Sequence, residues 1–365
     1  MDFFDSLEIE QKINAATTYT AIGGSLMPQE VIEAMNSAAG SFVDMRELQA
    51  KAGAKIAQLT KNEGAFVTAG CAAAIVLSIL ALRTKGDVVE IDRVITGTAK
   101  DSEVIIQTGH RINYDAAIKL AGSKIIAIGD AIETHPWQLE SAINEKTTAI
   151  FFVAGTHLSR PTMPLHQVVE IARSKGIPVV VDAAAQLPPM SNFWEFTKNM
   201  GAELVLFSGG KALRGPQASG LILGKEKYIE AIQANASPNG RLARAMKVGK
   251  EEIAGLTAAV ERFVNLDHGA ELAKWNQVID YWYTNLSQST NASIEKELLN
   301  EAGQPVPRLR ITPSSGNGVE VVEQLRTNRP SIEVVHNSKG TFWLSADSLK
   351  DGEAEIVLTE ALKYL

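Results

Sequence analysis

Lys211 stands in a short glycine-framed stretch whose residue types could do chemistry. Residues 205–220 read VLFSGGKALRGPQASG, so an apolar run leads through a serine and two glycines to the lysine. A nucleotide-binding phosphate loop needs a glycine five residues before the second glycine and a hydroxyl residue after the lysine. Val205 and Ala212 occupy those positions, which excludes that loop. The stretch is then either a solubilising surface turn or a site of covalent catalysis by the lysine amine.

A lysine amine can form a Schiff base with pyridoxal phosphate (PLP), and this chemistry needs partners that the sequence can be searched for. The first is a carboxylate for the pyridine nitrogen. Asp182 ends the apolar run IPVVVD, and ligands of open α/β sheets bind at the carboxyl ends of strands. The alternative role for Asp182 is to cap the following turn.

The second partner is a cradle for the cofactor phosphate. In FVTAGCAAAIVLSILAL a strand gives way, over Thr68, Ala69, Gly70 and Cys71, to a strongly apolar helix. Free backbone N–H groups and the positive end of a helix dipole bind phosphate. Ser208, three residues before the lysine, could donate its hydroxyl to the same phosphate.

The third partner is a flat group to stack on the cofactor ring. His110, in QTGHRIN, is the best candidate, and an ordinary surface-loop histidine is the alternative. Arg111 beside it could bind phosphate or substrate. The other histidines lack metal-ligand spacing such as HExxH, so we expect no metal, and GxSxG is absent, which argues against a nucleophile elbow.

The elements that must position these residues follow an alternation of short apolar runs and amphipathic stretches, which is typical of α/β proteins with a mainly parallel sheet. PVVVD and LVLF lack polar alternation, as expected of strands covered by helices on both faces. We predict strands at 65–68, 87–91, 104–107, 124–128, 149–153, 178–181, 204–207 and 221–223. We predict helices at 71–83, 114–121, 137–144, 165–174 and 193–200.

The pattern changes after about residue 250. The sequence here predicts a smaller α+β domain, made of a long helical stretch through about 285, a strand RLRIT, a helix near 319–326, strands at 332–335 and 341–344 and a final helix. The predicted division is an N-terminal segment 1–45 that contributes to the active site and small domain, a large cofactor domain 46–250 and a small domain 251–365.

Composition narrows the function classes. The 365 residues are 45% hydrophobic and carry a net charge of −7 with no basic stripe, which argues against nucleic-acid binding. Cys71 is the one cysteine, which fits a reducing compartment. The N-terminal stretch lacks the pattern of a signal peptide, and no run of some 20 apolar residues predicts a membrane span, so we expect a cytoplasmic protein.

Taken together, these motifs make the chain resemble fold-type I PLP enzymes. INAATTYTAIGGSLMPQEVIEAM, FVDMRELQAKAG, VTAGCAAA, VVVDAAAQLPP, FSGGKALRGPQASG and MKVGKEEIAGL look like the branch related to L-seryl-tRNA(Sec) selenium transferase, over about residues 12–265. Within it they look most like ammonia-lyases of phosphorylated amino sugar acids such as D-glucosaminate 6-phosphate.

The resemblance implies roles for particular residues. Lys211 would form the Schiff base, Asp182 would hold the pyridine nitrogen, and the phosphate cup would come from the 68–71 turn with Ser208. The segment 17–25, with Thr20 and Ser25, would line the substrate pocket, and Arg308 and Arg310 are candidates for the substrate carboxylate. Relatives often carry a second hydroxyl residue where this chain has Ala69, which puts one phosphate contact in doubt.

The resemblance also implies a homodimer or larger assembly and a small amino-acid-like substrate. The leading hypothesis is α,β-elimination on a 2-amino-3-hydroxy acid, giving a 2-keto acid and ammonia. Racemisation, aldol cleavage, transamination, a selenium-transferase-like reaction on seryl-tRNA and a non-catalytic PLP-binding role stay open as alternatives. Selenium transferases carry additional N-terminal sequence for tRNA binding, whereas this chain enters the PLP-domain pattern almost immediately. This difference argues against seryl-tRNA as the substrate.

Overall fold

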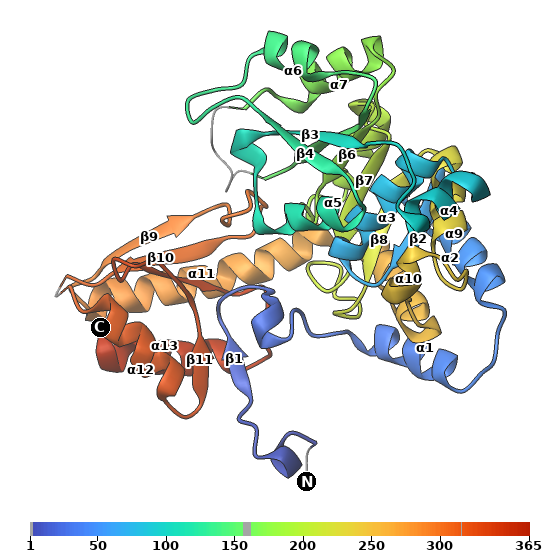
Figure 1. The fold of residues 1–365 in the computed structure, drawn as a ribbon. Coiled ribbons are helices and arrows are strands. Elements are labelled where there is room, and N and C mark those ends of the chain that lie inside the picture. The colour runs from blue at the N-terminus through green and yellow to red at the C-terminus, as the bar shows by residue number, and fades with distance from the viewer. Residues whose placement is uncertain (1–2, 156–161, 315) are drawn as a thin grey trace. The chain divides into compact units, whose positions relative to one another are not determined.

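The computed structural model describes residues 3–155, 162–314 and 316–365. The chain forms two compact units (Figure 1). The larger unit is Met27–Asn265, and the smaller combines Met1–Leu26 with Leu266–Leu365. The three-part division expected from the sequence, with a separate role for each part, stays a prediction.

A seven-stranded sheet forms the centre of the larger unit, in the order β2-β8-β7-β6-β5-β3-β4. Neighbouring strands from β7 through β4 pair in parallel, and β8 is antiparallel to both of its neighbours. This arrangement confirms the predicted α/β class with a mainly parallel sheet. The strands are β2 Gly64–Thr68, β3 Glu103–Gln107, β4 Lys124–Ile128, β5 Thr147–Val153, β6 Val179–Asp182, β7 Leu204–Ser208 and β8 Gly220–Gly224.

Helices cover both faces of this sheet (Figure 1). Successive residues of one strand enter two separate apolar clusters: Val181 and Val205 lie in one, Val180 and Leu206 in the other. Both sets are buried, which explains why these strands show no polar alternation. The helices of this unit are α1 Gln29–Ala39, α2 Met45–Thr60, α3 Cys71–Thr84, α4 Val88–Thr96, α5 Ala116–Leu120, α6 Pro136–Ala142, α7 Leu165–Ser174, α8 Asn192–Trp194, α9 Glu226–Asn235 and α10 Lys250–Asn265.

One sequence-based expectation about the elements was wrong, and two others were right in position but differ in detail. The strand predicted at 87–91 is the start of α4, because the Asp87 carboxylate accepts the N–H groups of Val89 and Glu90 and caps a helix. The long helical stretch predicted from about 251 consists of two helices, α10 and α11 His268–Ser289, with the second capped by Asp267. The helix predicted at 193–200 is a short α8 followed by a π-helical turn, Glu195–Asn199.

The smaller unit is built on a four-stranded antiparallel sheet in the order β12-β13-β10-β9. Its core contains Trp282, Leu309 and Phe342 from the C-terminal part together with Ile13 from the N-terminal segment. Besides α11, its elements are β1 Lys12–Asn14, β9 Ser293–Glu297, β10 Arg308–Thr312, α12 Gly318–Thr327, β11 Ser331–Glu333, β12 Val335–His336, β13 Phe342–Ser345 and α13 Glu353–Tyr364.

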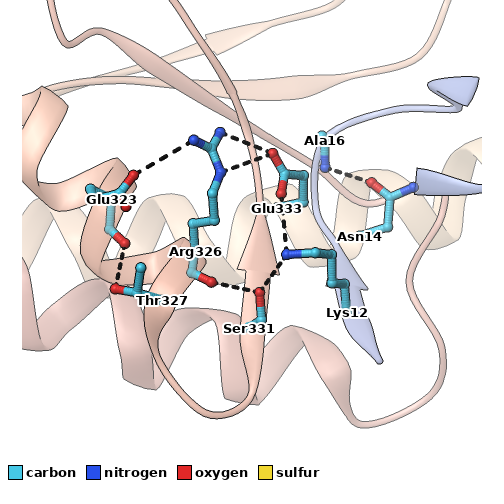
Figure 2. Close-up of polar contacts among 8 residues, drawn as sticks. All are labelled: Lys12, Asn14, Ala16, Glu323, Arg326, Thr327, Ser331 and Glu333. Atoms are coloured by element: carbon cyan, nitrogen blue, oxygen red, sulfur yellow. Dashed lines mark hydrogen bonds and ion pairs between the residues drawn. The ribbon is translucent and has the colours of Figure 1, made fainter. Parts of the chain in front are cut away.

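The N-terminal segment joins this unit through β1, which pairs in parallel with β11. Figure 2 shows the polar contacts that accompany the pairing. The Lys12 amine donates to Ser331 Oγ at 2.9 Å and lies 3.7 Å from the Glu333 carboxylate, which also binds Arg326 Nη2 at 3.0 Å. Residues more than 300 positions apart therefore fold as one body.

Candidate active site

The candidate cofactor residues of the larger unit lie at the edge of the sheet where the parallel strands end. Asp182 is the last residue of β6 and Ser208 the last of β7, while the 3₁₀ turn Thr108–His110 directly follows β3. Thr68 ends β2 and, like Ser208, pairs with Gly220 at the start of β8. This edge is the ligand-binding edge of an open α/β sheet.

Asp182 has one carboxylate oxygen engaged and one free. Oδ1 accepts the Ala184 N–H at 3.0 Å and the Cys71 thiol at 3.9 Å. Within the described part of the chain, Oδ2 accepts no hydrogen bond. Burial raises the pKa of the Asp182 carboxyl, opposed by the Ala184 N–H, the charge of Lys211 and the Cys71 thiol. A buried carboxylate with an open oxygen fits a cationic nitrogen heterocycle such as a pyridinium.

The loop that carries Lys211 closes on itself through its backbone. Gly209 N–H donates to Ser219 O at 2.9 Å, and Gly215 N–H donates to Gly209 O at 2.8 Å. A Cβ on Gly209 would lie 2.0 Å from Ser219 Oγ, and one on Gly210 would lie 2.4 Å from the side chain of Gln217. The glycines that frame the lysine are therefore required by close packing.

Lys211 shares its surroundings with Asp182 and Cys71. Its charge acts on both of these groups, and burial together with the Asp182 charge raises the pKa of the Cys71 thiol well above its usual range. Across the described residues, the Lys211 amine has no carboxylate within 4 Å. The thiol therefore stays protonated at neutral pH and serves as a weak donor to Asp182.

The turn between β2 and α3 offers backbone donors to an anion. Gly70 is the N-cap of α3 with φ +86° and provides no side-chain cap, so the first N–H groups of a 14-residue helix stay available. Thr68 Oγ1 donates to Gly70 O at 2.9 Å, which fixes the turn, and Ala69 lies within it. A Cβ on Gly70 would meet no atom within 4 Å, so the turn borders open space.

Gly220 is a site residue that sequence reasoning missed. A Cβ at this position would lie 2.5 Å from Gly70 C and 2.7 Å from Cys71 N. Only glycine lets β8 approach the turn this closely. Gly220 is the last residue of the stretch 205–220, but nothing in the sequence alone indicates which backbone it must face.

His110 is buried and neutral. Its Nδ1 accepts the Val153 N–H at 3.5 Å, and its ring packs edge-on against Phe152 with centroids 4.4 Å apart. Burial lowers the pKa of His110 to about 4. The histidine is therefore not the surface-loop residue of the alternative hypothesis; stacking on a cofactor ring stays a prediction.

The other candidate residues are engaged elsewhere. Arg111 Nε pairs with the Asp115 carboxylate. Arg308 binds Glu297 at 2.7 Å and Glu301 at 2.8 Å, and Arg310 binds Glu295 at 3.0 Å. Thr20, which starts a 3₁₀ turn, Ser25, Arg308 and Arg310 belong to the smaller unit, so their substrate-binding roles stay predictions.

Comparisons with known proteins agree with this architecture. The sequence profile of the L-seryl-tRNA selenium transferase (SelA) family matches residues 12–350. D-glucosaminate-6-phosphate ammonia lyase of Salmonella typhimurium is 30% identical over 98% of this chain and 96% of its own. The 5'-C-glycyluridine monooxygenase-decarboxylase of a Streptomyces species is 29% identical over 90% of this chain and 83% of its own.

Solved structures give the same result. A structure of D-glucosaminate-6-phosphate ammonia-lyase covers 100% of this chain and 98% of its own, with a TM-score of 0.86 and 28% identity. A serine palmitoyltransferase with PLP covers 96% of this chain and 87% of its own, with a TM-score of 0.62 at 13% identity, and shows the fold alone. The expected fold type I and the resemblance stated from the motifs are both confirmed.

Proposed function

Because this chain belongs to the L-seryl-tRNA selenium transferase family, we propose that it is a PLP-dependent ammonia-lyase acting on a small 2-amino-3-hydroxy acid. One observation carries the proposal: the buried Asp182 carboxylate, with Oδ2 open, lies within electrostatic reach of Lys211 at the carboxyl edge of the sheet. The uncapped N-terminus of α3 begins beside it, at Cys71.

The residues present match what the cofactor requires. Asp182 Oδ2 would hold the pyridine nitrogen, and the first N–H groups of α3 with the Ser208 hydroxyl would hold the phosphate. His110, being neutral, would present a flat ring without adding a competing positive charge. When bound, PLP supplies an electron sink that stabilises negative charge developing at the substrate Cα.

The chain's own part in the reaction is proton transfer and binding. Lys211 Nζ would hold the cofactor, and its amine, once free, would take the proton from the substrate Cα as general base. Loss of the β-hydroxyl and subsequent hydrolysis give a 2-keto acid and ammonia. Asp182 would favour this course because its negative charge would keep the pyridine nitrogen of the bound cofactor protonated.

The substrate class rests on the relatives. We propose a phosphorylated amino sugar acid such as D-glucosaminate 6-phosphate, supported by similarity to an ammonia lyase of that name over 98% of this chain. A second relative is named for a monooxygenase-decarboxylase reaction, so proteins similar to this chain carry out more than one chemistry. Racemisation, aldol cleavage, transamination, transfer to seryl-tRNA and PLP binding without turnover are therefore outcomes to be distinguished by experiment.

A substrate screen distinguishes them. Hydroxy amino acids and phosphorylated amino sugar acids are incubated with the PLP-loaded protein, and ammonia and 2-keto acid are measured together. Release of both in equal amounts, lost in Lys211→Ala and kept in Lys119→Ala, is the expected result; Lys119 is an exposed lysine of α5. Racemisation or transamination without ammonia, or turnover retained by Lys211→Ala, would refute the proposal.

A homodimer and a cytoplasmic location stay predictions beside this proposal. None of the helices in the described parts of the chain has the length and apolar character needed to cross a membrane.

A further inference from the structure

A cavity of about 500 Å³ lies at the amino ends of β6 and β7, away from the edge that carries Asp182 and Ser208. Small-molecule sites typically enclose about 300–1,000 Å³. The proposed reaction uses none of its lining residues. All of them belong to the larger unit: Lys61, Asn62, Glu63, Arg173, Thr197, Lys198, Gly201, Ala202, Glu203, Gly224 and Lys225.

Cations outnumber carboxylates on this lining. Lys61, Arg173, Lys198 and Lys225 face two glutamates. Among the described residues, only Lys225 of these four has a carboxylate within 4 Å. Lys61 Nζ instead lies 3.9 Å from the centre of the Trp194 ring, which holds the amine over an aromatic face.

Both glutamates already have donors. Glu63 Oε1 binds the Lys225 amine at 2.6 Å. Glu203 Oε2 accepts the Val179 N–H at 2.7 Å, and burial raises the pKa of this carboxyl, opposed by that N–H and more weakly by the Arg173 charge. The carboxylates are therefore committed to the protein, while positive charge is left over.

The neutral polar groups of the cavity are committed as well. Thr197 Oγ1 donates to Asn62 Oδ1 at 2.6 Å, and Asn62 Nδ2 donates to Phe193 O at 2.8 Å. An uncharged polyol would find few open partners here. The open groups are cationic, so an anion gains more from this cavity than a neutral ligand does.

The backbone around the cavity is unusual in two places. Thr197 and Lys198 belong to the π-helical turn Glu195–Asn199. Such turns are rare in proteins overall, and those that occur are often at functional sites. Gly201 has φ +88°, and a Cβ there would lie 2.3 Å from Arg173 Nη2. The absence of a side chain at Gly201 therefore leaves room for the guanidinium.

We propose that this cavity binds a small phosphorylated anion, with Arg173 and Lys198 as its main ligands and Lys61 adding charge. A guanidinium binds phosphate oxygens in pairs, and lysine acts as a point charge beside it. This site is separate from the proposed ammonia-lyase reaction, because its lining residues lie at the amino ends of β6 and β7 while Asp182 and Ser208 lie at the carboxyl ends.

Pyrophosphate titration by calorimetry tests the proposal at constant ionic strength without divalent metal. The protein is saturated with PLP, so that the candidate phosphate cup is filled and cannot bind the probe. We expect saturable binding that weakens about tenfold or more in Arg173→Gln and in Lys198→Gln, since each change removes a charge-assisted hydrogen bond. Lys175→Gln, an exposed α7-end lysine outside the lining, should leave the affinity unchanged.

A second variant guards against simple loss of folding. Arg173→Lys keeps the charge but loses the paired donors, so we expect affinity between those of the parent and Arg173→Gln. Unfolding temperatures without pyrophosphate identify variants that are folded. Absence of saturable binding to the parent, or parent affinity in the folded Arg173→Gln and Lys198→Gln variants, would overturn the proposal.

Discussion

Replacement of Gly220 by alanine tests whether the close approach between β8 and the 68–71 turn builds the phosphate site. The new Cβ would lie 2.5 Å from Gly70 C, 2.6 Å from Gly70 O and 2.7 Å from Cys71 N, whereas ordinary contacts begin at 3.4 Å. The backbone of the turn must therefore move by nearly 1 Å. Such overpacking costs about 1–3 kcal/mol of stability.

The same movement displaces the donors at the start of α3. Loss of one charge-assisted hydrogen bond to phosphate costs about 1.5–3 kcal/mol, so we expect PLP affinity to fall about 10-fold to 100-fold. The affinity is measured by titrating cofactor-free protein with PLP and following the visible absorbance. Thermal unfolding of the same sample reports the stability loss.

Gly240→Ala is the matched control, because a Cβ at Gly240 would meet no atom within 4 Å. This variant should bind PLP and unfold as the parent does. If Gly220→Ala, shown by circular dichroism to be folded, binds PLP with parent affinity, the turn does not form the phosphate site as argued.

Two further predictions concern charge at the same edge. Asp182→Asn should raise the unfolding temperature of the cofactor-free protein at neutral pH, because burial raises the pKa of Asp182 and charging it opposes folding; turnover should fall about 10²–10³-fold. An unchanged rate would contradict the assignment. Burial lowers the pKa of His110 to about 4, so the unfolded chain binds a proton at this histidine at a higher pH than the folded chain does. The free energy of unfolding of the cofactor-free protein should therefore fall by up to roughly 3 kcal/mol between pH 6.5 and pH 4. The free energy of unfolding of His110→Gln, measured with denaturant, should not show this loss at low pH. The same pH dependence in the variant and the parent would refute the prediction.

Strands buried on both faces were the most predictable part of the fold. PVVVD ends at Asp182, and LVLF is followed directly by Ser208. One physical cause, helices on each side of the sheet, accounts for both the composition and the burial of these strands. Since parallel strands share a carboxyl edge, ranges far apart along the chain could be placed together by their position at strand ends.

Short apolar runs were the least predictable part. VVEI in α4 is rich in β-branched residues and so predicts a strand, yet Asp87 with Glu90 three residues later matches a helix-capping pattern that was available in the sequence. β9 was missed for the opposite reason. Its sequence SIEKE has one apolar residue, as befits an edge strand protected by charge.

The sequence predicts which residue types form the candidate site, but it does not predict which residues they contact. Lys211, Asp182 and the 68–71 turn follow from chemistry and position along strands, whereas the Gly220 approach joins backbones that are 150 positions apart. The sequence RLRIT likewise does not predict that Arg308 and Arg310 form ion pairs with glutamates, because those glutamates come from neighbouring chain segments. Sequence position predicts which edge a residue reaches, while only the fold determines its partners.

The buried carboxyl of Asp182 supports the proposal that this edge binds a ligand. Its carboxyl is buried, its pKa is raised, and the groups that oppose this shift are an amide N–H, a lysine amine not in direct contact and a weakly donating thiol. Stability from such a group is present below its unfolded pKa and is lost as the pH rises through the folded one. Keeping this carboxylate charged in the cofactor-free fold is therefore unfavourable, and a cation bound at Oδ2 would offset that cost. A position selected for stability alone would favour an uncharged residue, so the charge itself argues that this edge is built for a ligand.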